Sequence, residues 1–274
     1  MRKLCLAMLA FTVSVVAWTA GQEPPPTTAG LDEWVRQSTY IFRGKVQRLN
    51  ASNLKVLPPA PGTAVVLVEN VLDAPKTFGD FTGKEVTVQL REPNRPAVQE
   101  DAIFFTNGWL YGENIAVTEV AHQAVPSNEE ELRRHISALR QKMVEEKLQG
   151  RIARSTLVVA GRVTATQPVE KDGRRAPSEH APDWWKATVA IDTIVKGQTT
   201  ARQIEVLFPK STDEMWLNSP KFEVGEQGVW ILQSNQKERG LPALRVPGLT
   251  ALDPLDFWPT GELPRIKKLV NTGQ

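Results

Sequence analysis

The sequence has few of the residues that carry most enzyme chemistry. It contains one cysteine, three histidines and two tyrosines among 274 residues. The cysteine, Cys5, lies near the N-terminus, so a chain that loses this segment has neither a thiol nor a disulfide. Thiol catalysis and cysteine-ligated zinc are thereby excluded. Exported eukaryotic domains often rely on disulfides, and their absence favours a bacterial exported protein with self-sufficient hydrophobic cores.

Metal and phosphate chemistry also lack their usual sequence patterns. The histidines His122, His135 and His180 are isolated and do not have HExxH-type spacing. Because zinc needs three or four convergent ligands, each histidine is expected to be structural or solvated. The sequence contains no GxSxG, phosphate-loop or GxGxxG motif. We therefore expect a non-enzymatic protein with no cofactor and no bound metal.

The charge balance does not indicate a nucleic-acid partner. The chain has 33 Lys and Arg residues against 31 Asp and Glu residues, and Arg2 and Lys3 account for the difference. A protein that binds nucleic acid needs a concentrated basic surface. The pattern predicts no nucleic-acid partner.

Residues 1–21 have the features of a secretory signal peptide. Arg2 and Lys3 form a positive start, and residues 4–17 form an apolar stretch that small residues follow. Cleavage is expected near Ala17 or Gly21. The alternative is an uncleaved anchor helix, but the apolar run is shorter than the ~20 residues that a membrane span needs. We expect an extracytoplasmic protein, periplasmic or secreted, with no stable membrane insertion after cleavage.

Two segments of the chain resemble each other enough to indicate an internal repeat. Residues 31–46 read LDEWVRQSTYIFRGKV, and residues 148–163 read LQGRIARSTLVVAGRV. Identical residues recur at one constant offset: Leu31, Ser38, Thr39, Gly44 and Val46 correspond to Leu148, Ser155, Thr156, Gly161 and Val163. Each segment predicts a helical turn or two and then a strand of β-branched and aromatic residues.

The correspondence continues in order along both copies. The further matching blocks are 64–68 with 187–191, Val86 and Val88 with Ile204 and Val206, and 100–105 with 226–231. A last short strand is expected near 115–118 and near 241–245, and a helix follows Pro126 and Pro259. In the first copy Leu132, Ile136, Leu139 and Met143 form one apolar helical stripe. The pattern predicts two copies of one β-rich module, each followed by a helix.

Five short strands and a flanking helix favour a small closed barrel such as the OB-fold. An immunoglobulin-like sandwich is the main alternative, but it needs about seven strands. The predicted fold is mainly β with flanking helices: two tandem five-stranded OB-like barrels joined by a long amphipathic helix. The expected ranges are signal peptide 1–21, proline-rich linker 22–30, first module 31–126, connecting helix 127–150, second module 151–258 and C-terminal helix 259–274.

The repeated pattern resembles the tissue-inhibitor-of-metalloproteinases-like (netrin-module-like) OB-fold family. The residues that carry the resemblance are Ser38 with Gly44-Lys45-Val46, Ser155 with Gly161-Arg162-Val163, Val224-Gly225-Glu226 and Ile194-Val195-Lys196-Gly197. The resemblance covers nearly all of the chain after the signal peptide, in two tandem cysteine-free copies. In that family an N-terminal cysteine chelates the protease zinc. This chain begins its mature part with Gln22-Glu23-Pro24, so inhibition by that mechanism is not implied.

Candidate binding residues are the aromatic and cationic side chains of the expected loops. OB-folds usually bind ligands through the loops between strands one and two and between strands four and five. In the second copy the first of these loops, 167–183, carries Arg174, Arg175 and His180 and precedes Trp184 and Trp185. In the first copy the loop 107–114 carries Trp109 and Tyr111, and Trp216 is a further candidate. Inward packing of Trp185, solvated arginines and a barrel-covering Trp216 are the alternatives.

These features predict an exported, non-enzymatic binding protein. Loop aromatics on one or both barrels would engage a protein or glycan partner, because aromatic rings beside cations stack on sugars and peptide groups. The alternative is a structural or scaffolding subunit of an extracytoplasmic assembly.

Overall fold

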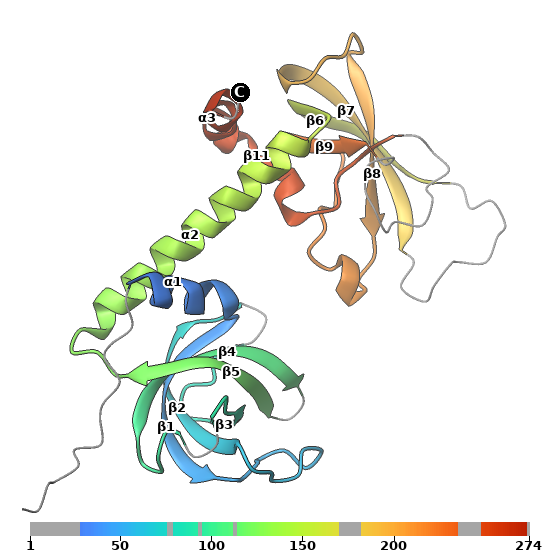
Figure 1. The fold of residues 1–274 in the computed structure, drawn as a ribbon. Helices are drawn as coiled ribbons and strands as arrows, with labels where there is room; N and C mark the ends of the chain where they lie inside the picture. The colour runs from blue at the N-terminus through green and yellow to red at the C-terminus, as the bar shows by residue number, and fades with distance from the viewer. Residues whose placement is uncertain are drawn as a thin grey trace, which may run out of the picture. The chain divides into compact units, whose positions relative to one another are not determined.

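The computed structural model describes residues 28–75, 79–92, 95–111, 114–169, 182–234 and 248–272. The chain divides into two compact units, Met1–Leu139 and Arg140–Gln274. The predicted fold class is confirmed: the protein is mainly β, with two closed five-stranded barrels, a helix between them and flanking helices (Figure 1).

The first unit is one barrel with a short helix before it. Its elements are α1 (Thr28–Gln37), β1 (Tyr40–Leu49), β2 (Thr63–Asp73), β3 (Glu85–Gln89), β4 (Asp101–Tyr111) and β5 (Ile115–Ala124). The strand order is β1-β2-β3-β5-β4, and β4 pairs with β1 to close the ring. The β3–β5 pair is parallel and the other pairs are antiparallel. This is the connectivity of an OB-like barrel.

The second unit repeats this connectivity. Its elements are β6 (Leu157–Pro168), β7 (Asp183–Lys196), β8 (Gln203–Lys210), the 3-10 helix η2 (Glu214–Trp216), β9 (Gln227–Ser234), β10 (Leu249–Thr250), η3 (Pro254–Asp256), β11 (Phe257–Pro259), η4 (Thr260–Glu262) and α3 (Leu263–Thr272). Strand β10 pairs in parallel with β8 and antiparallel with β9, which closes the ring. Strand β11 pairs antiparallel with Gly228, Val229 and Trp230 of β9.

The two barrels share the irregularities of their first strands as well as their strand order. The β1–β2 register shifts between Ile41 and Phe42, between Arg43 and Gly44, and between Val46 and Arg48. The β6–β7 register shifts at the three corresponding places. Gly44 and Gly161 lie at the middle shift, where the strands approach closely: a Cβ at Gly161 would lie 2.1 Å from the carbonyl oxygen of Ala190.

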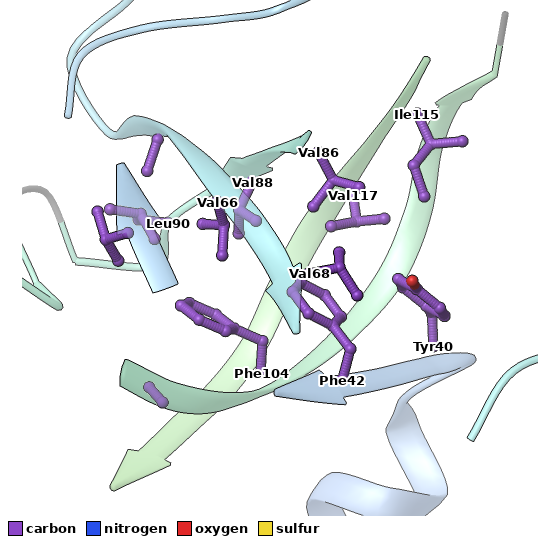
Figure 2. Close-up of a cluster of buried hydrophobic side chains, with 13 residues drawn as sticks. Tyr40, Phe42, Val66, Val68, Val86, Val88, Leu90, Phe104, Ile115 and Val117 are labelled. Atoms are coloured by element: carbon purple, nitrogen blue, oxygen red, sulfur yellow. The ribbon is translucent and has the colours of Figure 1, made fainter. Parts of the chain in front are cut away.

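The interior of the first barrel is filled by side chains from all five strands. Phe42 and Phe104 stack with their ring centroids 5.3 Å apart, and valines of β2, β3 and β5 surround them. Figure 2 shows Val66, Val68, Val86 and other apolar side chains converging on these rings. Burial of these residues supplies most of the driving force for folding of this unit.

The second barrel has a more aromatic interior. Trp230 occupies the position that corresponds to Phe104 in the first barrel, because it pairs with Val159 as Phe104 pairs with Phe42. Phe222 and Phe257 pack against Trp230, with ring centroids 5.9 and 5.0 Å from it. The two barrels therefore share their strand order but differ in the side chains that fill their cores.

Helices bury the outer face of the first and fourth strands. In the first unit Trp34 of α1 packs on Phe105 of β4, with ring centroids 5.5 Å apart. In the second unit residues of α3 and of the end of α2 (Glu129–Arg154) pack on β6 and β9; they include Leu148, Ile152, Ile266 and Val270. Since both faces of these strands are buried, their sequences are apolar runs and do not alternate.

Several predicted bounds differ from the structure. The helix expected over 127–150 spans Glu129–Arg154, and the C-terminal helix α3 begins at Leu263. Residues 107–111, expected in a loop, are the end of strand β4, because β4 and β5 pair up to Tyr111 and Ile115. The fifth strand of the second barrel is Leu249–Thr250, whereas the expected position 241–245 lies outside the described residues.

Candidate functional site

The second barrel has a groove along β7 and β8. Its volume is about 720 Å³. The described residues that line this second-barrel groove are Thr156, Gln167, Pro168, Val169, Lys186, Ile204, Glu205, Leu207, Ser234, Gly248 and Leu249. They lie on β7 and β8 and at the ends of the connections from β6 to β7 and from β9 to β10. OB-like barrels bind ligands with this face and these two loops.

Two opposite charges lie within the groove. The ammonium of Lys186 donates a hydrogen bond of 2.6 Å to the carboxylate of Glu205. The side chain of Glu205 is 54% exposed, so this ion pair contributes about 0–1 kcal/mol to stability. Lys186 has three donors and Glu205 two acceptor oxygens, which leaves both groups able to bind a ligand.

The rest of the groove is apolar or neutral. Ile204 and Leu249 contribute partly exposed aliphatic surface, Leu207 is buried, and Gln167 and Ser234 contribute neutral polar groups. None of the described lining residues is aromatic. A site with one ion pair among aliphatic side chains suits a ligand that combines apolar groups with hydrogen-bonding groups.

The same face of the first barrel is covered by the chain itself. Thr87 occupies the position that corresponds to Glu205, because it lies opposite Val65 as Glu205 lies opposite Thr188. The hydroxyl of Thr87 accepts a hydrogen bond from the Asn53 amide and donates one to the Asn53 side-chain oxygen, at 3.0 and 2.6 Å. Thr87 is fully buried. The β1–β2 connection thus covers this face of the first barrel, whereas most of the corresponding β6–β7 connection lies outside the described residues.

The structure brings two of the predicted site residues together in the second barrel. Trp184, at the start of β7, and Trp216, in η2, meet edge to face with ring centroids 5.5 Å apart. Trp216 is only 8% exposed, so it offers little surface to a partner. The neighbouring Trp185 packs against the barrel core and is covered by the ammonium of Lys210, 3.9 Å from the ring centroid.

The other predicted residues lie apart from this pair. Trp109 is the unpaired residue of a β-bulge between Gly108 and Leu110 of β4, and its side chain is 37% exposed. Bulges turn a side chain away from the regular pleat, and here the bulge leaves an aromatic ring accessible. Tyr111 is the last residue of β4, and its side chain lies outside the described part of the structure. Arg174 and Arg175 also lie outside the described residues.

The histidines of the described residues have carboxylate partners. The ring of His122 contacts Glu119 at 2.6 Å, and that of His135 contacts Asp32 at 2.7 Å. Within the described ranges, no three His, Cys, Asp or Glu side chains are grouped so that they could hold a metal ion. His180 lies outside these ranges.

Sequence reasoning missed Lys186, Glu205 and Leu207 as site residues. Each lies in a strand, and its residue type is common at such a position, so the sequence alone does not mark it as a binding residue. A signal was present in the repeat: the strand positions that hold Thr63 and Thr87 in the first copy hold Lys186 and Glu205 in the second. A change from small hydroxyls to charges marks two positions that are buried in the first copy and partly exposed in the second.

The fold and the groove together define a class: a protein of two tandem OB-like barrels, the second with an open groove on its β7–β8 face. Comparison with protein-family models and with curated proteins finds no match. Among the described helices, none combines the length and apolar character that crossing a membrane requires.

Proposed function

We propose that this chain is an exported, non-enzymatic binding protein whose second barrel engages a protein or glycan partner. The observation that carries the proposal is the second-barrel groove, which holds an exposed ion pair at positions that are buried in the first barrel. Trp109, exposed on a bulge of the first barrel, is a second surface suited to contact. The resemblance to the tissue-inhibitor-of-metalloproteinases-like family is part of this proposal and rests on the sequence motifs.

The test is capture of partners from the native extracytoplasmic fraction by the protein without residues 1–21. Replacing Ser234, which lines the groove, with Trp should fill the groove and abolish capture. The double variant Trp109→Ala and Tyr111→Ala tests the bulge separately. Capture that survives both changes would contradict the assignment of both surfaces.

Export is tested on the same preparation. Intact mass measurement should show a chain that lacks the residues up to Ala17 or Gly21. A chain that retains them would contradict cleavage.

A scaffolding role is the second candidate, and one observation favours it. The connection between β8 and β9 exposes three large apolar side chains, Met215, Leu217 and Val224. Exposed apolar groups gathered on one segment are typical of surfaces that assemblies bury. Light scattering after size exclusion distinguishes the roles: an obligate oligomer that Leu217→Lys dissociates would favour the scaffold, and a monomer would favour the binding protein.

A further inference from the structure

The β1–β2 connection of the first barrel, residues 50–62, covers outward-facing positions of β2 and β3. Val65 and Thr87 lie opposite each other on these strands, and both are fully buried. Neither belongs to the core cluster, whose members Val66 and Val88 point into the barrel (Figure 2). Because side chains alternate along a strand, Val65 and Thr87 face outward, and the connection that contacts Thr87 shields both from solvent.

Apolar burial does not hold this connection in place. None of residues 50–61 is buried, although Leu54 and Leu57 are half-buried, and Val56 is 80% exposed. The main-chain hydrogen bond from the amide of Leu57 to the carbonyl oxygen of Leu54 stays within the connection. Segments with few buried apolar contacts open at a low cost in free energy, without unfolding of the whole domain.

Asn53 attaches the middle of the connection to the barrel. Its main-chain amide donates to the Thr87 hydroxyl at 3.0 Å, and its side-chain oxygen accepts from the same hydroxyl at 2.6 Å. Its side-chain amide donates to the carbonyl oxygen of Glu85 at 2.6 Å, and its own carbonyl oxygen accepts from the Asn114 side chain at 3.2 Å. The hydroxyl of Ser52, 3.4 Å from that of Thr87, adds a weaker contact. Attachment of the segment therefore depends mainly on one residue.

The two ends of the connection are held independently of Asn53. The amide of Ala51 donates to the carbonyl oxygen of Thr63 at 3.3 Å. The hydroxyl of Thr63 accepts from the amide of Ala60 at 3.2 Å and donates to its carbonyl oxygen at 2.7 Å. The residues between these ends, 52–59, belong to no strand, so they can leave the barrel without loss of strand pairing.

We propose that residues 52–59 form a lid over the β2–β3 face of the first barrel, held shut by Asn53, and that this lid opens while the barrel stays folded. Opening uncovers Val65 and the hydroxyl of Thr87. OB-like barrels bind ligands with this face, so the lid controls access to it. The lid is separate from the second-barrel groove, and its absence would leave the proposed function intact.

The test measures how fast buried cysteines react with iodoacetamide. The protein without residues 1–21 contains no cysteine, so each variant carries a single thiol. Val65→Cys places the thiol under the lid. The control Val66→Cys places it in the barrel core, one residue further along the same strand. Mass spectrometry follows both reactions at several low urea concentrations, and circular dichroism verifies that both variants fold.

We expect Val65→Cys to react more than about tenfold faster than Val66→Cys, at a rate that low urea hardly changes, because opening the lid exposes little surface. Val66→Cys should react only through unfolding of the unit, at a rate that rises with urea. Adding Asn53→Ala to Val65→Cys should raise its rate about tenfold to a hundredfold, the size of two lost hydrogen bonds. Equal rates and equal urea dependence for the two cysteines would overturn the lid, and so would an unchanged rate with Asn53→Ala.

Hydrogen exchange of the protein without these substitutions gives a second measurement. The amide of Asn53, which is bonded to Thr87, should exchange at a rate that low urea does not change. The most protected amides of β2 should exchange only through unfolding of the unit, with a rate that rises with urea. Exchange of the Asn53 amide through that same unfolding would contradict a lid that opens by itself.

Discussion

The guanidinium of Arg151, near the end of α2, donates three hydrogen bonds of 2.9, 2.5 and 2.6 Å to the carboxylate of Asp256. Asp256 is fully buried, and its carboxylate also accepts from the main-chain amides of Leu252 and Asp253. This pair connects the helix to η3, beside the strand β11 that extends the second sheet. It is the most deeply buried ion pair among the described residues.

Removal of Arg151 should destabilise the second unit strongly. Arg151→Gln leaves a buried carboxylate without its counter-charge, and breaking such a pair costs about 3–5 kcal/mol. Urea unfolding monitored by tryptophan fluorescence measures this loss. The control is Arg265→Gln in the same unit, whose partners Glu145 and Glu262 are partly exposed; it should cost at most about 1 kcal/mol. Equal losses in the two variants would contradict the structural role of the buried pair.

The cost of Arg151→Gln should depend on pH. Burial raises the pKa of Asp256, while Arg151 and the main-chain amides of Asp253 and Leu252 act to lower it. A carboxyl with a raised pKa stabilises the folded state fully below the unfolded pKa of about 4, and this contribution is lost as pH rises through the folded pKa. Without Arg151 the pKa rises further, so the variant's deficit should be larger at neutral pH than in mild acid. Urea titrations of both proteins at the two pH values measure the difference, and a deficit that shrinks towards neutral pH would contradict this sign.

Gly161 should not tolerate a side chain. A Cβ there would lie 2.1 Å from the carbonyl oxygen of Ala190, a main-chain atom that moves only with its strand. Gly161→Ala should therefore destabilise the second barrel by about 1–3 kcal/mol, as overpacking does. Gly261 is the control, because a Cβ at that position meets no atom within 4 Å. Thermal unfolding of the two variants compares them, and a neutral Gly161→Ala would show that β6 and β7 do not approach closely at the bulge.

Residues Asn53 and Thr87 should be energetically coupled. Asn53→Ala removes the side-chain bonds to Thr87 and to the Glu85 carbonyl oxygen. The buried groups left unpaired cost about 1–3 kcal/mol. Thr87→Val removes the same contact from the other side, so the double variant should lose less than the sum of the single variants. A double-mutant cycle by urea unfolding measures this coupling, and additive losses would show that the loop does not depend on Thr87.

Much of the fold could be predicted from the sequence because the two copies repeat local patterns. Blocks such as 64–68 with 187–191 take equivalent places in the two barrels, since their apolar residues face the core in both. Strand β4 extends to Tyr111, beyond residue 107 where the sequence predicts a loop. Asn107 and Gly108 are typical of loops, but pairing with β5 keeps residues 107–111 extended.

The sequence by itself determined that the chain consists of two related β modules with a long helix between them. The pattern of apolar residues along each strand is a local property, and it recurs in order in both copies. Only the tertiary structure decided which residues meet on the corresponding face of each barrel. That difference depends on long-range hydrogen bonds, from Asn53 to Thr87 in the first barrel, and on the juxtaposition of Lys186 and Glu205 across β7 and β8 in the second. These are contacts between residues that lie far apart in the sequence, and the local pattern of apolar residues does not determine them.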